Sequence, residues 1–226
     1  MKGKLIAIEG TDGSGKGLQT TLLVNALCDT GLITRTFRFP DYTSPTGQII
    51  GECLLGLDEF GDNPWFDNPA KVDYLVASAY YAADRRYNID KINKYLEQGI
   101  NVVTDRYVYS NMAHQGGKVN DKVKRLDVYK KLELLEFTVM ELPVPDDTYY
   151  LSVPYEQSEI LRRKRGHMDY VERDKEYLIQ AENAYNELTD LYGFYKIDCI
   201  KDGELRKIDD ISNELVSKVL QKTFNK

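Results

Sequence analysis

Short apolar runs alternate with longer amphipathic segments along the whole chain. The apolar runs are rich in β-branched and aromatic residues, as is typical of strands buried in a sheet. They predict five strands, at Lys4–Glu9, Thr34–Phe39, Ile100–Thr104, Asp147–Val153 and Phe194–Cys199. The segments between them predict helices at Leu18–Cys28, Asn68–Gln98, Asp121–Phe137, Glu176–Leu191 and Ile208–Leu220, with a basic helix starting near Tyr155.

This alternation predicts an α/β fold of three layers, in which helices cover both faces of a five-stranded parallel sheet. The longest helix is expected to begin at Asn68-Pro69, since a capping residue followed by proline is a frequent helix start, and to end at Gly99. No repeat or Gly/Ser linker divides the chain, so residues 1–226 are expected to form one domain. Ligands of such sheets bind beyond the carboxyl ends of the strands.

A glycine-rich loop follows the first predicted strand. Residues 10–17 read GTDGSGKG and fit the phosphate-binding pattern G-x-x-x-x-G-K between a strand and a helix. The glycines allow backbone N–H groups to point at a phosphate, and the helix adds its positive dipole end. We expect nucleotide phosphates to be bound by Gly10, Thr11, Asp12, Gly13, Ser14, Gly15, Lys16 and Gly17. The alternative is a glycine-rich turn without a ligand.

Gly17 departs from this pattern, because a serine or threonine hydroxyl normally holds Mg²⁺ at that position. Magnesium would then be held through water, the nucleotide and a carboxylate from elsewhere. Asp105, directly after the third predicted strand, is the candidate metal ligand. Its alternative role is that of a buried or capping aspartate.

Composition narrows the class of protein. The chain has 226 residues, of which 42% are hydrophobic and 29% charged, the ordinary balance of a globular protein. No apolar run approaches the ~20 residues of a membrane-spanning helix, so no membrane association is expected. The three cysteines, Cys28, Cys53 and Cys199, are scattered and are interpreted as reduced thiols of a cytoplasmic protein.

The net charge of −6 argues against a protein that binds nucleic acid through a basic face. It does not exclude a small phosphorylated ligand, because such a ligand responds to the local field. Arginines indeed gather in three segments, 84–86, 105–107 and 162–165. A kinase whose acceptor already carries a phosphate needs such arginines to bring two polyanions together.

In these residues the sequence resembles the thymidylate kinases, which transfer a phosphoryl group from ATP to dTMP. The resemblance covers nearly the whole chain, and its motifs occur in order. They are IEGTDGSGKG at 8–17, RFPDYTSPTG at 38–47, YAADR at 81–85, DRYVYSNMAHQGGK at 105–118 and RRKRGHMDYVERD at 162–174. The resemblance implies a P-loop NTPase fold with an arginine-rich lid at about 162–174.

Tyr81 and Arg85 lie four residues apart and therefore on one face of a helix. A ring beside a guanidinium suits a planar base, with the arginine donating to a carbonyl such as thymine O4. The resemblance assigns these roles to the same two positions. The alternatives are core packing for Tyr81 and a surface charge for Arg85.

Asn111 matches the asparagine of the family that hydrogen-bonds the base. Gln115 either lies near the same pocket or caps a turn. His114 stands where many relatives have tyrosine, next to the sugar. It either helps to exclude a ribose 2′-hydroxyl or is a half-buried structural histidine.

Asp12 matches the carboxylate that contacts the acceptor's 3′-hydroxyl near the transferred phosphate; its alternative role is to stabilise the turn. Arg106 and Arg38 are expected to hold the acceptor phosphate, although Arg38 alternates with phenylalanines and either binds phosphate or faces solvent. Tyr42 stands in a region where many relatives have an arginine, and is expected to give a single hydroxyl contact.

Some relatives carry a catalytic arginine inside the phosphate loop where this chain has Gly13, and relatives with glycine there supply it from the lid. Arg163 and Arg165 are therefore candidate catalytic residues beside Lys16, Asp12 and Arg106, with Arg162 third. For each lid arginine the alternative is a solvated helix end. Asp169 and Glu172 match lid carboxylates near the acceptor sugar, or they pair with neighbouring arginines.

The resemblance implies ATP and Mg²⁺ as cofactors, dTMP as the acceptor and a homodimer in the cytoplasm. Two other functions stay open. One is a kinase for another nucleoside monophosphate or for a deoxynucleoside, whose hydroxyl needs a base such as Glu9. The other is a nucleotide-binding protein without turnover, which the missing hydroxyl at Gly17 would favour.

Overall fold

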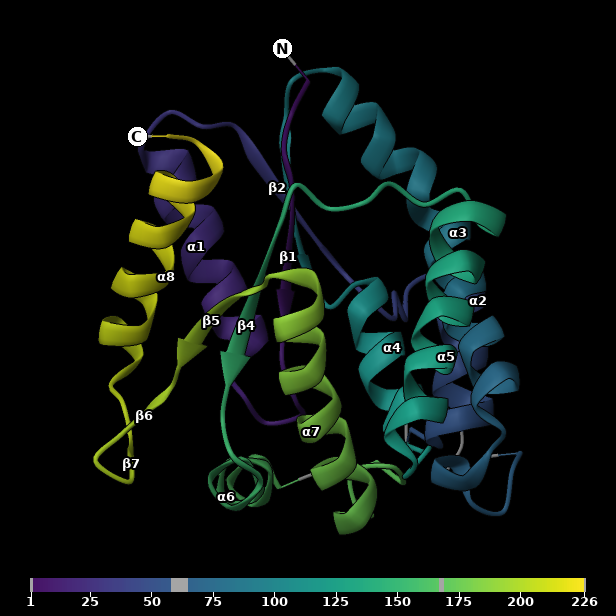
Figure 1. Cartoon of the computed structure of the whole chain (residues 1–226). Helices are drawn as coiled ribbons and strands as arrows, with labels where there is room; N and C mark the ends of the chain where they lie inside the picture. Colours follow the sequence, from purple (N-terminus) through teal and green to yellow (C-terminus); the bar gives the residue numbers. More distant parts are fainter. Residues whose placement is uncertain (1, 58–64, 167–168, 226) are drawn as a thin grey trace.

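A computed structural model describes residues 2–57, 65–166 and 169–225. Five strands form one parallel sheet in the order β2-β3-β1-β4-β5 (Figure 1). They are β1 at Leu5–Glu9, β2 at Thr34–Arg38, β3 at Asn101–Asp105, β4 at Asp147–Ser152 and β5 at Tyr195–Asp198. The five-stranded parallel sheet predicted from the sequence is confirmed, and every strand lies inside its predicted segment or extends one residue beyond it.

The helices are α1 at Lys16–Asp29, α2 at Pro45–Ile50, α3 at Tyr74–Glu97, α4 at Val108–Gly116, α5 at Lys122–Glu133, α6 at Tyr155–Arg165, α7 at Lys175–Tyr192 and α8 at Ile208–Thr223. Shorter helical segments in the described part of the chain are the π-helical η1 at Gly51–Leu55 and η4 at Leu134–Val139, and the 3₁₀ turn η3 at Pro69–Lys71. A small antiparallel hairpin, β6 at Ile200–Lys201 with β7 at Glu204–Leu205, precedes α8.

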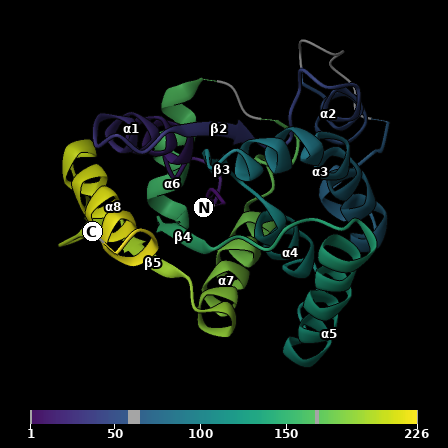
Figure 2. The same ribbon diagram turned by 90° about the horizontal axis from the view of Figure 1, so that it is seen from above.

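Helices cover both faces of the sheet, as the strand–helix alternation predicted. Helices α1 and α8 lie against one face, and α3, α4 and α7 lie against the other (Figure 2). The central strand β1 is buried along its whole length. Its side chains alternate, so Ile6 and Ile8 pack with Leu23 of α1, whereas Leu5 and Ala7 pack on the opposite face.

The predicted start of the long helix at Asn68-Pro69 is wrong. Asn68 caps only the 3₁₀ turn η3, and α3 begins at Tyr74. The chain is extended at Val72, and the Asp73 carboxylate then accepts hydrogen bonds from the N–H groups of Leu75 and Val76. The true cap is therefore Asp73, a second capping residue further along the chain.

Helix α4 follows β3 directly and carries several of the predicted site residues. Its N-terminus is capped from a distant part of the chain: the buried Glu9 carboxylate of β1 accepts from the N–H groups of Tyr107 (2.9 Å) and Ser110 (3.2 Å). Because a carboxylate satisfies the otherwise unpaired N–H groups of a helix start, Glu9 fixes where α4 begins. This places α4 at the carboxyl ends of β1 and β3.

Within the described ranges, no helix combines the length and the apolar character that a bilayer-spanning segment requires.

Candidate active site

A cavity of about 320 Å³ opens beyond the carboxyl ends of the central strands, where the sequence placed the ligand. All of the predicted substrate-binding residues line it. They are Asp12, Arg38, Tyr42, Tyr81, Arg85, Arg106, Asn111, His114, Gln115 and Glu172, and the lid residues Arg165 and Asp169 join them. The structure therefore brings together residues that are up to 160 positions apart in the sequence (172 − 12).

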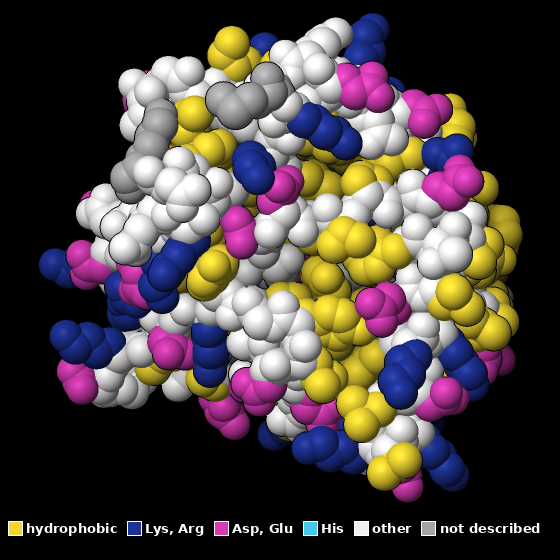
Figure 3. Space-filling model, turned by 45° about the horizontal axis from the view of Figure 1, so that its top comes forward, with side chains coloured by type: hydrophobic (Ala, Val, Ile, Leu, Met, Phe, Trp, Pro, Cys, Tyr) yellow, Lys and Arg dark blue, Asp and Glu magenta, His cyan; other side chains and the backbone are white. Residues whose placement is uncertain are grey.

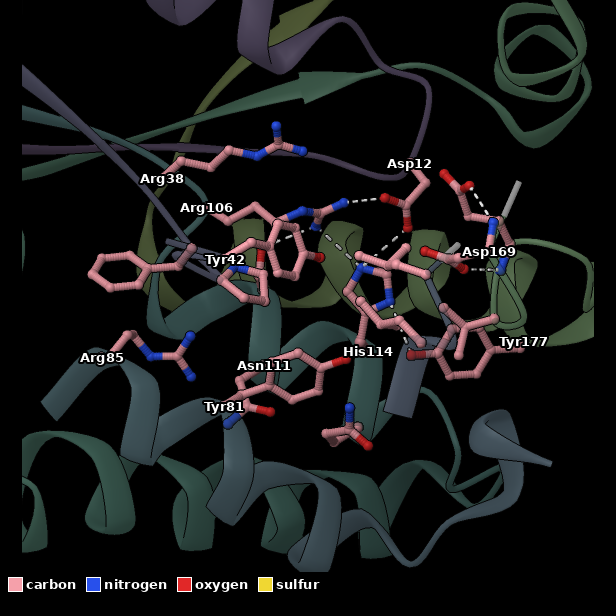
Figure 4. Close-up of a pocket in the computed structure, with 18 of the residues that line it drawn as sticks. Asp12, Arg38, Tyr42, Tyr81, Arg85, Arg106, Asn111, His114, Asp169 and Tyr177 are labelled. Atoms are coloured by element: carbon pink, nitrogen blue, oxygen red, sulfur yellow. Dashed lines mark hydrogen bonds and ion pairs between the residues drawn. The ribbon is translucent and has the colours of Figure 1, made fainter. Parts of the chain in front are cut away.

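The labelled side chains fall into two groups. Figure 4 shows Arg38, Arg106 and Asp12 along one side of the cavity, nearest the phosphate loop. Arg85, Tyr81 and Asn111 lie along the other side. We call the first group the phosphate end and the second the base end of the cavity.

The phosphate loop has the backbone that its glycines predicted. Gly10, Gly13 and Gly15 have φ of 157°, 81° and 80°, and α1 begins at Lys16. The Lys16 ammonium is buried and donates to the carbonyl oxygen of Thr11 at 2.7 Å. Burial and the neighbouring positive charge of Arg106 lower the pKa of Lys16 to about 8. The ammonium thus lies inside the loop. A bound anion there would raise the pKa of Lys16 back toward its ordinary value.

Arg106 and Asp12 form the centre of the phosphate end. Arg106 has φ of 67°, a left-handed conformation that is uncommon for a side-chain-bearing residue and marks functional sites. Its guanidinium pairs with the Asp12 carboxylate and also donates to the carbonyl oxygen of Gly10 at 3.3 Å and to Ser110 Oγ at 3.2 Å. Although burial acts in the opposite direction, Arg106 and its neighbours hold the pKa of Asp12 well below its usual value.

His114 lies between the two ends of the cavity. Its Nε2 accepts from Arg106 at 3.3 Å, so the proton is on Nδ1, which donates to the Tyr177 hydroxyl at 3.1 Å. Burial lowers the pKa of His114 to about 3, against the attraction of Asp12. The ring is therefore neutral, and it joins α4 to Tyr177 of α7.

The base end is built on a buried ion pair. Arg85 and Glu136 are 2% and 0% exposed, and the guanidinium donates through Nε to Glu136 Oε2 at 2.8 Å and through Nη2 to Oε1. Asn111 donates through Nδ2 to the same Oε1 at 2.6 Å and to the carbonyl oxygen of Ser78 at 3.2 Å. Arg85 is thus not a surface charge, which was the alternative left open by the sequence.

Asp105 lies beside the phosphate loop with an oxygen available to a metal. It is 7% exposed, its Oδ2 is 3.8 Å from Arg38 Nε, and its buried Oδ1 has no hydrogen-bond partner among the described residues. A Cβ built on Gly17 would lie 3.2 Å from Asp105 Oδ2, so the glycine lets this carboxylate approach the start of α1 closely. The donor set fits a magnesium ion carried mainly by phosphates and water, with one carboxylate from the protein.

The three lid arginines lie within four consecutive positions but have three different surroundings. Arg162 is 1% exposed and donates to the carbonyl oxygen of Asp12 and to Ser158 Oγ, both at 2.8 Å. Arg163 is exposed and pairs with Glu159 one turn away. Arg165 lines the cavity and pairs with Glu172. Arg162 is therefore the lid arginine that contacts the phosphate loop, and Arg163 lies outside the cavity.

The loop and α6 are in close contact at Gly13. A Cβ built on Gly13 would lie 2.7 Å from the carbonyl oxygen of Ser158 and 2.9 Å from Arg162 Cγ. The absence of a side chain at position 13 is thus what allows Arg162 to reach the loop. The expected lid, 162–174, includes residues 167–168, which are outside the described residues.

The carboxylates of Asp169 and Glu172 each accept a hydrogen bond from the backbone N–H of the other residue. Asp169 Oδ1 accepts from the N–H of Glu172 at 2.9 Å, and Glu172 Oε2 accepts from the N–H of Asp169 at 3.1 Å. Burial, followed by the nearby charge of Glu172, raises the pKa of Asp169 to about 7. Glu172 thus both lines the cavity and pairs with Arg165, so the two possibilities considered for it are compatible.

Reasoning from the sequence missed Glu136, Tyr177 and Tyr185. Tyr185 donates to Glu9 at 3.2 Å and lies 3.4 Å from Arg106, so it supports the phosphate end from α7. A tyrosine or glutamate inside an amphipathic helix carries no local mark of such a role. The only available signal was the helical phase of Tyr177 and Tyr185, which lie eight positions apart and so share a face of α7.

Cations gather at the phosphate end although the chain as a whole is acidic. Lys16 and Arg162 are buried around the loop, and Arg106 is partly buried beside them. On the face of the molecule shown in Figure 3, by contrast, basic and acidic side chains are interspersed. The local field at the loop therefore differs in sign from the net charge of −6.

Comparison with known proteins agrees with this geometry. The family model described as thymidylate kinase matches residues 8–204. A thymidylate kinase of Prochlorococcus marinus (strain NATL1A) is 31% identical over 217 residues, which cover 95% of this chain and 97% of the relative. A thymidylate kinase of Dictyostelium discoideum is 29% identical over 229 residues, covering 100% of this chain and 88% of the relative.

A solved structure of thymidylate kinase from Candida albicans has the same fold, with a TM-score of 0.74 at 22% identity; the match covers 99% of this chain and 93% of that one. The extent of the family match, together with the sequence identity to the Prochlorococcus relative, identifies the family. This chain belongs to the thymidylate kinase family.

Proposed function

We propose that this protein transfers the γ-phosphoryl group of ATP to the 5′-phosphate of dTMP. The observation that carries the proposal is the cavity itself: a phosphate loop with Lys16 and Arg106 at one end, and buried hydrogen-bonding groups on Arg85 and Asn111 at the other. Such a cavity fits a small molecule that has a base at one end and a phosphate at the other.

At the base end, Arg85 donates to O4 of thymine and Asn111 binds N3 of the same edge. Tyr81 lies on the helix face of Arg85 and stacks on the ring plane. Gln115 and His114 line the cavity next to these groups. His114, held neutral between Arg106 and Tyr177, occupies the space beside the sugar and disfavours a ribose 2′-hydroxyl.

At the phosphate end, Arg106 and Arg38 bind the acceptor phosphate, with Tyr42 adding a hydroxyl contact. Asp12 positions the acceptor sugar through its 3′-hydroxyl. The acceptor oxygen is already anionic, so the reaction needs no general base. Catalysis then comes from alignment of the two nucleotides and from stabilisation of charge on the migrating group.

The donor phosphates bind the loop 10–17 and Lys16. Arg162 is the lid arginine best placed to stabilise the migrating phosphoryl group, because it is held at the loop by Asp12 and Ser158. Arg165 reaches the cavity from the end of α6, and Arg163 ranks third. Closure of segment 162–174 over both nucleotides would exclude water.

When bound with ATP, magnesium would supply positive charge that offsets the negative charge of the donor phosphates. Asp105, whose buried Oδ1 has no hydrogen-bond partner among the described residues, would be its ligand on the protein. We further propose a homodimer located in the cytoplasm; sedimentation velocity and cell fractionation would test these two points.

A kinase for a deoxynucleoside is disfavoured by the position of Glu9. That reaction needs a base at the 5′-hydroxyl, yet Glu9 is fully buried and accepts from Tyr107, Ser110 and Tyr185. It also lies outside the residues that line the cavity. The extra arginines of the phosphate end would then have no acceptor phosphate to bind.

The direct test measures ADP release with Mg-ATP and parallel acceptors: dTMP, dUMP, dCMP, dGMP, AMP and thymidine. We expect turnover that strongly favours dTMP. Preference for thymidine would support the nucleoside kinase instead. Absence of turnover with every acceptor, in a protein that still binds ATP, would indicate a nucleotide-binding protein without activity.

A further inference from the structure

Glu136 is a buried acid that reaches both base-reading side chains but does not line the cavity. It lies in η4, the π-helical turn between α5 and β4, and contacts side chains of α3 and α4 without lining the cavity. Its Oε1 accepts from both Arg85 and Asn111, and its Oε2 accepts from Arg85. One carboxylate therefore fixes two side chains that come from different helices.

The partners of Asn111 determine which way its amide points. Ser78 offers a carbonyl oxygen and Glu136 a carboxylate, and both groups can only accept hydrogen bonds. The amide nitrogen must therefore face them. The oxygen and nitrogen of an amide have nearly the same shape, so these two acceptors are what fixes its orientation. This leaves Asn111 Oδ1, which is buried and has no hydrogen-bond partner among the described residues, as the atom that a ligand can use.

The partners of Arg85 have a complementary effect. A guanidinium carries N–H groups on all three nitrogens. Glu136 engages Nε and one side of Nη2, which leaves Nη1 to donate toward the cavity that Arg85 lines. The base end thus presents one acceptor and one donor in fixed positions.

We propose that Glu136 is a positioning residue that sets base specificity, because it holds an acceptor on Asn111 and a donor on Arg85 toward the base. This inference rests on the proposed function and deepens it. The pair complements a pyrimidine with N3–H and a 4-oxo group. A 4-aminopyrimidine presents the opposite pattern, with a lone pair facing Asn111 Oδ1 and an amino group facing Arg85.

Replacement of the acid by its amide should relax this choice. In Glu136→Gln, one carboxylate oxygen becomes an NH₂ group. At the Oε2 position it faces Arg85 Nε, which loses its acceptor, and at the Oε1 position it faces both Arg85 Nη2 and Asn111. In the second case the Asn111 amide gains by turning over, since its oxygen can accept from that NH₂ at the cost of the longer contact with Ser78. Its own NH₂ would now face the base and suit N3 of a 4-aminopyrimidine.

The test compares dTMP with 5-methyl-dCMP, which differ only at N3 and the 4-position, by ADP release in wild type and Glu136→Gln. We expect the ratio of kcat/KM for dTMP over 5-methyl-dCMP to fall at least about tenfold in the variant, through loss with dTMP and gain with 5-methyl-dCMP. The KM for ATP should stay within about twofold. A residue that only supports the fold would lower both acceptors together and leave their ratio unchanged.

Glu187→Gln is the matched control, because Glu187 also accepts from an arginine, Arg125, and from a second side chain, Tyr129, but does not line the cavity. Its ratio should equal that of wild type. If Glu136→Gln does not fold, Glu136→Asp keeps the charge that Arg85 requires while its shorter side chain releases Asn111, and the ratio should fall at least about threefold.

The two levels of the proposal fail separately. A wild-type protein that does not phosphorylate dTMP contradicts the proposed function. A wild-type protein that prefers dTMP, with an unchanged ratio in whichever Glu136 variant folds, overturns the role of Glu136 alone.

Discussion

The two ends of the cavity use charged residues in opposite ways. At the base end, Arg85 and Glu136 are buried together and neutralise one another. At the phosphate end, Lys16, Arg106 and Arg162 surround Asp12, so positive charge is in excess. The comparison indicates that the base end uses an ion pair to orient hydrogen-bonding groups for a neutral base, whereas the phosphate end keeps net charge for anions.

The cost of each arrangement also differs. A buried ion pair gains little net stability, because desolvation of both charges offsets their attraction, but removal of one partner costs roughly 3–5 kcal/mol. The charge of Arg85 is therefore already balanced by Glu136 and needs no charged ligand. At the phosphate end, burial and then the like charge of Arg106 lower the pKa of Lys16 to about 8, and a bound anion would offset both effects.

The largest effect is expected at the phosphate end. Arg106→Ala should lower kcat/KM for dTMP at least about 10³-fold, because it removes the charge that binds the acceptor phosphate and stabilises the migrating group. Arg106→Lys should recover only part of the activity, since lysine lacks the planar fork that contacts Asp12 and Ser110. A loss of less than tenfold in Arg106→Ala would contradict the assignment.

At the base end, Arg85→Ala should raise the KM for dTMP roughly 10²-fold and leave the KM for ATP within about twofold. Its neighbour Arg86→Ala is the control, because Arg86 is 41% exposed and pairs with Asp90 and Glu141. A lower Tm is also expected for Arg85→Ala, since Glu136 loses its partner. Equal losses for dTMP and ATP would remove the distinction between the two ends.

The lid arginines extend the comparison to α6. Arg162→Ala should reduce kcat about 30-fold or more, because the side chain holds the loop at Asp12 and lies beside the expected path of the phosphoryl group. Arg163→Ala should change kcat less than about twofold, since an exposed ion pair one turn apart contributes little. The reverse order in steady-state kinetics would restore Arg163 as the leading candidate.

The smallest effect concerns stability and pH. The pKa of Asp169, raised to about 7 in the folded protein from an ordinary value of 3.8, means that the folded state binds this proton more tightly than the unfolded state. Stability should therefore fall as pH rises from about 4 through 7. Asp169→Asn removes this titration and keeps an oxygen for the N–H of Glu172.

In the absence of nucleotides, we expect Asp169→Asn to have a higher Tm than wild type. The difference in Tm between the two proteins should increase by at least about 2 °C from pH 5 to pH 8. Thermal melts of both proteins in the same buffers make the comparison, because all other titrating groups are shared. A constant difference across this range would show that Asp169 is ionised throughout.

Local patterns were sufficient for the phosphate loop, the strands and the residues directly after them. The loop needs only neighbouring glycines and Lys16, and Asp105 and Arg106 follow from the end of β3. The helix phase of Tyr81 and Arg85 likewise placed both on the cavity. These features depend on a few adjacent residues, which is why one sequence predicts them.

The features that were missed depend on contacts between distant segments. Glu136 has no local property that separates it from Glu133, which lies one turn earlier and bonds Tyr192 instead. The start of α4 depends on Glu9, 99 positions before Val108. The different surroundings of Arg162 and Arg163 follow from which face of α6 meets the loop, and the run RRKR does not specify that face.

The contact at Gly13 limits where a catalytic arginine can stand, in the phosphate loop or in the lid. Since the nearest obstacle to a side chain there is the backbone oxygen of Ser158, trimming Arg162 alone does not create room. The positive φ of residue 13 adds a conformational penalty for any other residue. An arginine at position 13 therefore requires α6 itself to move. A single substitution cannot transfer the role of Arg162 to the phosphate loop, because the position of α6 must change with it.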